Sequence, residues 1–215
     1  MVGSRLDEAR GLKKKATALR NRGQYERAQN TLDEAVRLLS TLLKERELPV
    51  REAKDIRAEL ADTFGMKGGV FRRAGDLSAA LAAYQEGRKV EEIDQESTYN
   101  LSNVIGLTVT QKGESPNDPI LRKDLARAIE HIEREIAGPR RDEWWAWSDL
   151  GQFYLLNNEP DKARSCYSDG RKQAGPTAEE IKRHVAILEE LSERTAATAP
   201  EIAANIRTQI TELSR

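Results

Sequence analysis

Hydrophobic residues recur every three or four positions along most of the chain, which is the pattern of amphipathic helices. Leu12, Ala16 and Leu19 follow this spacing near the N-terminus. Glycine and proline interrupt the pattern at intervals, and the segments between them run to roughly 14 to 24 residues, a typical helix length. The sequence therefore predicts an all-α chain of helices packed as antiparallel pairs.

One stretch does not follow the pattern of good helix formers. Residues 104–110 read VIGLTVT and are rich in β-branched side chains, which favour a strand by local propensity. We nevertheless predict a helix over residues 97–112, because a repeated pattern covers them and tertiary context often overrides local propensity.

That pattern is a set of large and small residues that occurs in four copies. The clearest copy begins with Trp147, which we expect to be a large buried aromatic residue. Gly151 and Ala163 are small enough to let two helices approach closely, and Tyr167 fills the remaining space. The members of this copy are Trp147, Leu150, Gly151, Tyr154, Ala163, Tyr167 and Gly170.

This spacing resembles the tetratricopeptide repeat, a 34-residue unit of two helices with the pattern W-x2-L-G-x2-Y followed by A-x3-F. The resemblance implies an α-solenoid of stacked helix pairs. The four units would cover residues 5–48, 50–95, 97–138 and 142–176 within a region of residues 1–176. The third unit carries an inserted loop at residues 114–123, which could itself contact a partner.

Residues 177–215 predict two further helices, the first of them capped by Thr177. Two interpretations remain open for this C-terminal hairpin. It is either a terminal cap that covers the last repeat, or a surface for dimerisation or partner binding.

Composition narrows the classes of function. The 215 residues include 35 basic and 36 acidic residues, for a net charge of -1, so the basic excess of a dedicated nucleic-acid binder is absent. No stretch approaches the roughly 20 apolar residues that span a bilayer. The N-terminus has no apolar segment typical of a secretory signal, and a cytoplasmic location is expected.

Residues that carry enzymatic chemistry are scarce. His131 is expected on the exposed face of a charged helix, and neither it nor His184 has a partner at metal-binding spacing. Cys166 is expected to be a packing thiol without an activating base. Gly69 is predicted to mark a close approach to the helix backbone. We therefore expect no enzyme activity, no cofactor and no metal.

What remains is a binding surface. In the family that the chain resembles, the first helix of each unit lines a concave groove. Carried over position by position, the resemblance implies partner contacts by Arg10, Lys13, Thr17, Arg20, Asp62, Gly69, Arg72, Asn100, Asn103, Trp145, Ser148 and Gln152. The cations among them would hold carboxylates, the asparagines a peptide backbone, and Trp145 would be an aromatic anchor.

The predicted function is that of a scaffold or adaptor that binds another protein or peptide, with a preference for acidic character. The segment GGVFRRAGDLSAALAAYQEGRKVEE also resembles repeat segments of bacterial conflict and signalling effector proteins. That second resemblance implies a regulatory subunit of a multiprotein bacterial complex. The alternative function is a helical repeat protein that binds nucleic acid.

Overall fold

The computed structural model describes residues 2–45, 47–94 and 97–214. Within these ranges the chain forms ten α-helices and no β-strand, which confirms the predicted all-α class. The helices are α1 (Val2–Asn21), α2 (Tyr25–Leu42), α3 (Val50–Arg73), α4 (Leu77–Asp94), α5 (Tyr99–Lys112), α6 (Pro119–Ile136), α7 (Trp144–Leu156), α8 (Pro160–Ala174), α9 (Ala178–Thr195) and α10 (Pro200–Leu213).

The helix predicted over residues 97–112 is also confirmed, because the β-rich stretch lies inside α5. Burial explains why tertiary context overrides propensity here. Val104, Ile105, Leu107 and Val109 are all buried, so their β-branched or aliphatic side chains fill the protein interior from helical positions.

The chain divides into two compact units, Met1–Val104 and Ile105–Arg215, which we call unit 1 and unit 2. The division falls inside α5, which begins in unit 1 and ends in unit 2. The grouping of residues 1–176 as four repeats, with residues 177–215 as a cap or dimerisation hairpin, stays a prediction.

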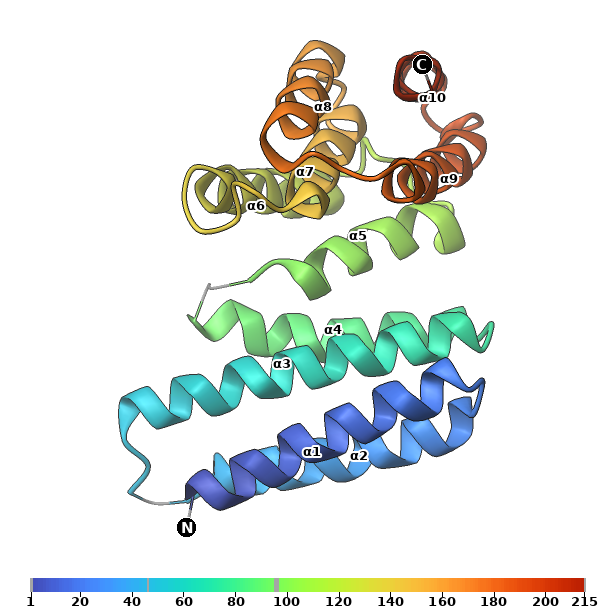
Figure 1. The fold of residues 1–215 in the computed structure, drawn as a ribbon. Helices are drawn as coiled ribbons and strands as arrows, with labels where there is room; N and C mark the ends of the chain where they lie inside the picture. The colour runs from blue at the N-terminus through green and yellow to red at the C-terminus, as the bar shows by residue number, and fades with distance from the viewer. Residues whose placement is uncertain (1, 46, 95–96, 215) are drawn as a thin grey trace. The chain divides into compact units, whose positions relative to one another are not determined.

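Unit 1 contains two helix pairs, α1 with α2 and α3 with α4, and α2 packs against α3 (Figure 1). The turn inside each pair depends on a glycine in the left-handed backbone region, Gly23 with φ of 72° and Gly75 with φ of 83°. Glycine adopts this conformation without a steric penalty, so each helix can end sharply and the chain can reverse.

Among the described residues of unit 1, two clusters of buried hydrophobic residues join α1, α2 and α3. One cluster joins α1, α2 and the first half of α3, and the other joins the opposite ends of the same helices. Burying each large aliphatic side chain contributes about 1.5–3 kcal/mol. The clusters consist of Ala9, Leu39, Leu42, Ile56 and Leu60, and of Ala16, Leu19, Ala28, Leu32 and Val70.

Unit 2 contains the pairs α7 with α8 and α9 with α10 (Figure 1). Helix α6 packs on α7, while α10 contacts both α7 and α8. Thr177 caps α9 as predicted, in a capping box with Glu180. The buried side chain of His184 on α9 lies 2.9 Å from the Tyr167 hydroxyl on α8, which ties the C-terminal hairpin to the pair before it.

The prediction for Trp147 is wrong in one respect, because Trp147 is only half-buried whereas Trp144 is the buried tryptophan. Trp147 lies over Gly170 and donates its indole N–H to the Arg141 carbonyl at 2.7 Å. The ring of Trp144 instead packs near Tyr167 and His184 inside unit 2.

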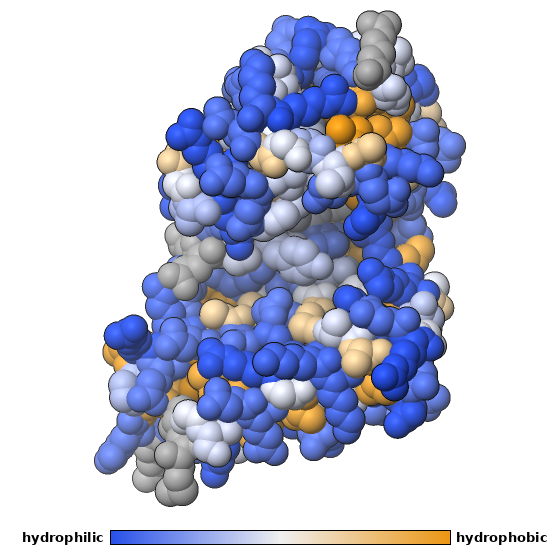
Figure 2. All heavy atoms as spheres, in the orientation of Figure 1, coloured by the Kyte–Doolittle hydropathy of each residue, from blue (hydrophilic) through white to orange (hydrophobic). Residues whose placement is uncertain are grey.

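Hydrophilic residues cover most of the face drawn in Figure 2, and hydrophobic residues show there as small patches. In the part of the chain that the structure describes, no helix is long and apolar enough to cross a membrane. Cys166 is buried, as expected for a packing thiol, and burial is the main reason that its pKa rises to about 12.

Candidate partner-binding surface

Four of the predicted groove residues lie on α1, and three others lie on the neighbouring helix α3. Arg10 of α1 donates to Glu59 of α3 at 2.7 Å, and Lys13 forms ion pairs with both Glu59 and Asp62. The same separation of 49 residues joins Arg10 to Glu59 and Lys13 to Asp62. Constant separation at two positions means that α1 and α3 run side by side in the same direction.

These ion pairs change what the predicted cations can do. Burial alone would lower the pKa of Lys13, but its bonds to Asp62 and Glu59 outweigh burial and raise the pKa. Burial would likewise raise the pKa of Glu59, but its bonds to Lys13 and Arg10 lower it. Lys13 and Arg10 are thus neutralised by acidic residues of α3 and join two helices.

The register between α1 and α3 places Arg20 level with Gly69, and Arg72 lies one turn further along α3. Leu19 and Val70 belong to one buried cluster, which supports the same alignment. Arg20 is half-buried, and among the described residues its guanidinium hydrogen-bonds only to the side chain of Asn21, at 3.3 and 3.4 Å. Arg72 is exposed and has no ion pair with any residue in the described ranges.

By this register Gly69 lies level with Arg20 and one turn before Arg72, and it has space beside it. A β-carbon added there would have only the Tyr84 hydroxyl oxygen nearby, at 3.7 Å, which is an ordinary contact. The close approach expected at Gly69 occurs instead at Gly65 and Gly68, where an added β-carbon would lie 2.7 Å from the Tyr99 ring and 2.6 Å from the Tyr84 ring. We call Arg20, Gly69 and Arg72 the cationic strip.

Thr17 and Asp62 complete the predicted set on α1 and α3. Thr17 is half-buried, and its hydroxyl donates to the carbonyl of Lys13 within its own helix. Asp62 is exposed but already pairs with Lys13. Neither residue therefore extends the cationic strip.

The two asparagines on α5 lie in different surroundings from the groove implied for them. Asn100 is fully buried, and its amide donates to the Ala61 carbonyl at 3.0 Å and to Glu91 at 2.9 Å. Asn103 is half-buried and donates to the carbonyl of Tyr99 in its own helix. Both amides bond within unit 1, and Asn100 has no surface to offer a peptide.

Sequence reasoning missed the partner of Asn100. Glu91 near the end of α4 is buried, and its carboxylate accepts the backbone N–H groups of Asn100 and Leu101 at the start of α5. Burial raises the pKa of Glu91, although these hydrogen bonds act in the opposite direction. Glu91 therefore caps a helix that is not its own. No local signal identifies it, because acidic residues also precede and follow it on the exposed face of α4.

Three predicted residues lie on α7 in unit 2. Trp145 is 39% exposed, and the guanidinium of Arg140 lies over its ring, 4.5 Å from the centroid. Ser148 is 5% exposed and Gln152 is 7% exposed, so these two are interior residues. The hydroxyl of Ser148 donates to the Trp145 carbonyl at 2.9 Å. Of this group, only Trp145 presents a side chain at the surface.

The expectation that His131 lies on an exposed helix face is wrong. His131 is buried, with its Nε2 atom 2.9 Å from the Glu135 carboxylate, and Glu135 is buried beside it. The other oxygen of Glu135 accepts from Arg140 at 2.7 Å. Two charged or polar residues of α6, His131 and Glu135, therefore lie in the interior. Their spacing in the sequence does not indicate this.

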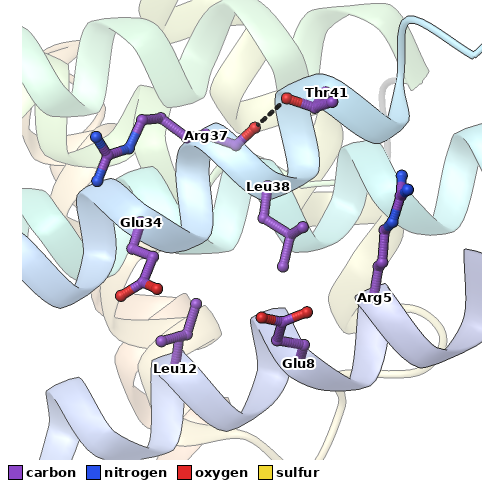
Figure 3. A pocket seen from close by; sticks show the side chains of 7 residues that line it. All are labelled: Arg5, Glu8, Leu12, Glu34, Arg37, Leu38 and Thr41. Carbon is purple, nitrogen blue, oxygen red and sulfur yellow. Dashed lines mark hydrogen bonds between the residues drawn. The ribbon is translucent and has the colours of Figure 1, made fainter.

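A shallow surface hollow of about 350 Å³ lies between α1 and α2 (Figure 3). Two leucines line it with two arginines and two glutamates, so its charges balance and favour neither an acidic nor a basic ligand. The Thr41 hydroxyl at its edge donates to the Arg37 carbonyl at 2.8 Å. Its lining residues are Arg5, Glu8, Leu12, Glu34, Arg37, Leu38 and Thr41.

Among the residues that the structure describes, no group of three or more histidine, cysteine, aspartate or glutamate side chains could hold a metal ion.

No protein-family model matches the chain, and no curated protein matches it. Among solved structures, it is similar to a Podospora anserina protein described as a kinesin light chain with nearly identical TPR-like repeats. That match has 16% identity and a TM-score of 0.47, and it covers 97% of this chain and 95% of the other.

The chain is also similar to the C-terminal part of a TPR repeat-containing protein from Cytophaga hutchinsonii. That match has 16% identity and a TM-score of 0.34, and it covers 93% of this chain and 78% of the other. With TM-scores of 0.47 and 0.34, these two likenesses transfer neither a partner nor a function to this chain.

Proposed function

We propose that this chain is an adaptor that binds another protein, and that it holds an acidic segment of that protein on the cationic strip of unit 1. The observation that carries the proposal is the difference among the cations of α1 and α3. Arg10 and Lys13 already form ion pairs with Glu59 and Asp62. In contrast, Arg20 and Arg72 form no ion pair with described residues.

The position of the strip suits an extended acidic segment. Guanidinium groups bind carboxylates through two parallel hydrogen bonds, so Arg20 and Arg72 can each hold one acidic side chain. Gly69, level with Arg20, has no side chain, which leaves room for the backbone of a bound segment. The ion pairs of Arg10 and Lys13 fix α1 against α3, so little ordering entropy opposes binding.

The remaining cations on α1 provide a matched control. Lys15 is exposed and lies two positions from Lys13, on a different face of the helix, and Arg22 is exposed just beyond the end of α1. Replacing Lys15 and Arg22 by glutamine removes the same charge as replacing Arg20 and Arg72, but from outside the strip.

The experiment is selection of peptides from a phage-displayed random library on the immobilised chain. We expect the selected peptides to be rich in aspartate and glutamate. The double variant R20Q/R72Q should weaken their binding at least about tenfold, the effect of losing one to two charge-assisted hydrogen bonds, while K15Q/R22Q should retain it. Selected peptides without acidic residues, or equal losses in the two double variants, would contradict the proposal.

A further inference from the structure

Tyr99 is the one exposed aromatic residue among those described in unit 1, with 42% of its surface accessible. It is the first residue of α5, and its ring packs on α3. The Cε1 atom of the ring lies 2.7 Å from the position that a β-carbon on Gly65 would occupy. Single exposed rings are common on protein surfaces. Tyr99 differs from such a ring because it lies beside the cationic strip.

The contact with Gly65 places the Tyr99 ring in line with the strip. Gly69 and Arg72 follow Gly65 by four and seven residues on α3, so all three share one face of the helix. With a rise of about 1.5 Å per residue, the level of Gly65 is about 6 Å from Gly69 and about 10 Å from Arg72 along the helix axis. Arg20 is level with Gly69. The strip therefore borders an aromatic surface at one end.

Neighbouring groups hold Tyr99 in place. Its ring meets the buried ring of Tyr84 edge to face, with centroids 6.3 Å apart and planes at 69°. Its backbone N–H donates to the Ser97 hydroxyl at 3.1 Å, and its carbonyl accepts from the Asn103 amide at 2.8 Å. Tyrosine has only two side-chain torsions, so a ring fixed in this way loses little entropy when a ligand packs on it.

Tyr84 connects the Tyr99 ring with the cationic strip. Its hydroxyl oxygen lies 3.7 Å from the position of a β-carbon on Gly69, so the buried ring reaches from Tyr99 to the strip. Burial, followed by the neighbouring Tyr99, raises the pKa of Tyr84, and the positive charge of Arg72 acts in the opposite direction. A guanidinium and an exposed ring thus border the same buried tyrosine.

We propose that Tyr99 is a specificity-determining residue of the cationic strip, and that it packs against an apolar side chain near an acidic residue of the bound segment. The inference rests on the proposed function, because it adds a second binding element to the same site. An extended segment advances about 3.3 Å per residue, so the distances from Gly65 to Gly69 and Arg72 correspond to about two and three residues. The preferred segment has an apolar residue two or three positions from an aspartate or glutamate.

A polypeptide suits this surface better than a single strand of nucleic acid. Single strands bind along a row of cations in which several aromatic rings stack successive bases. Here one exposed ring is present among the described aromatic residues of unit 1. Asp62 is exposed one turn from Gly65, on the side away from Arg72, where it pairs with Lys13. A phosphate backbone that reached the ring would approach this carboxylate, whereas an apolar side chain brings no charge to it.

The experiment compares two peptides on the full chain. One is a peptide selected by phage display, and the other is a copy in which alanine replaces the apolar residue. On wild type, the copy should bind about five- to tenfold more weakly, as expected when an apolar side chain loses its buried contact. On Y99A the two peptides should bind equally, while Y99F should behave as wild type. V50A removes an exposed apolar side chain about four turns earlier on α3 and should leave the difference unchanged.

The outcomes separate the role of Tyr99 from the proposed function. Selected peptides that depend on Arg20 and Arg72 but lack an apolar residue at this spacing would overturn the role of Tyr99 and leave the strip in place. An equal loss for the alanine copy on wild type and Y99A would do the same. Unchanged peptide binding in R20Q/R72Q would overturn both proposals. Tighter binding of an oligothymidine strand than of every selected peptide would also overturn the inference.

A second measurement covers the case in which Y99A does not fold, which circular dichroism shows. The full chain is labelled with 3-fluorotyrosine, and the Y99F variant assigns the fluorine NMR signal of Tyr99. The selected peptide should shift this signal, and the alanine copy at saturation should shift it much less. A signal that moves equally with both peptides, or with neither, would overturn the role of Tyr99.

Discussion

The ring of Tyr167 occupies the space where a β-carbon on Gly151 would lie, with its Cζ atom only 2.5 Å from that position. The ring of Tyr84 lies in the same way against Gly68, with its Cζ atom 2.6 Å from the corresponding position. The two tyrosines follow their glycines at the same spacing in the sequence, so one packing arrangement occurs in α3 with α4 and again in α7 with α8.

Neighbouring glycines on α3 should therefore respond in opposite ways to the same substitution. G68A forces a methyl group into the Tyr84 ring and should lower the free energy of unfolding by about 1–3 kcal/mol, as overpacking does. G69A has room for the methyl group and should raise it by up to about 1 kcal/mol, because alanine is the better helix former. Urea denaturation of both variants measures the difference.

Each glycine variant is the control for the other, since both add one methyl group to the same helix. Equal effects of the two substitutions would show that Tyr84 does not pack against Gly68. G69A also narrows the cationic strip, so it should weaken binding of the selected acidic peptides while the protein becomes more stable.

The tryptophans of α7 should differ in their contribution to stability. W144A removes a buried ring that packs near Tyr167 and His184, and it should cost about 3–5 kcal/mol. W147A removes a half-buried ring and one hydrogen bond, and it should cost less, about 1–2 kcal/mol. Denaturation curves that show a larger loss for W147A would mean that the positions of the two rings are exchanged.

His184 should make unit 2 sensitive to acid. Burial lowers its pKa from 6.5 to about 4. The unfolded chain therefore takes up this proton at a higher pH than the folded chain does. The free energy of unfolding should fall as the pH drops from 6.5 towards 4, at up to about 1.4 kcal/mol per pH unit.

Urea denaturation at about pH 7.5 and about pH 5 measures this dependence. H184Q cannot take up the proton, so the gap in stability between it and wild type should narrow on acidification. H131Q is the matched histidine control. It should show the same pH dependence of stability as wild type, because His184 is still present. If the difference in unfolding free energy between H184Q and wild type is the same at both pH values, His184 is not buried as a neutral imidazole.

Glu91 should matter as a hydrogen-bond acceptor and not as a charge. E91Q keeps an oxygen for the N–H groups of Asn100 and Leu101, while E91A leaves these buried donors without an acceptor. E91A should therefore be less stable than E91Q by about 1–3 kcal/mol. Equal stability of E91Q and E91A in denaturation experiments would contradict the role of Glu91 as a cap of α5.

The pH dependence of Glu91 has the opposite sign to that of His184. Because burial raises the pKa of Glu91, the folded state keeps this proton at a pH where the unfolded chain has lost it. The stabilising contribution of the group is therefore greatest at low pH and declines as the pH rises above 4.5. E91Q should gain stability relative to wild type over that rise.

The sequence was sufficient to predict the helices and much of how they pair. Gly23 and Gly75 mark turns because a left-handed backbone favours glycine, and this requirement is local. The spacing of Gly151 and Tyr167 indicates close helix packing, since a missing side chain and a large ring must meet. Residues 104–110 needed the repeat pattern as well, because their local propensity favours a strand.

The candidate site was harder to predict, because its chemistry depends on neighbours far away in the sequence. Nothing near Lys13 indicates that Glu59 and Asp62 neutralise it, as that follows from the register of α1 on α3. Asn100 occupies a groove position by counting, but it is buried and held by Glu91. The resemblance to the repeat family predicts which positions of a helix face the groove. It does not predict whether the side chain at each of those positions is buried.

His131 shows a related failure. A histidine within HIERE suggests a solvated helix face, because four of the five residues are polar. In the structure the buried face of α6 is wide enough to include His131 and Glu135 beside Ile132. Arg140, which lies outside the helix, balances the charge of the buried Glu135.

The most direct test of the account is capture of partners from the native host by the tagged chain, with mass spectrometry of what is retained at low and high salt. Wild type should retain one dominant protein with an acidic segment, K15Q/R22Q should retain it equally, and R20Q/R72Q should lose it while unfolding at nearly the same temperature as wild type. Retention of that protein by R20Q/R72Q, or capture of nucleic acid that high salt removes, would contradict binding of an acidic protein segment on the cationic strip.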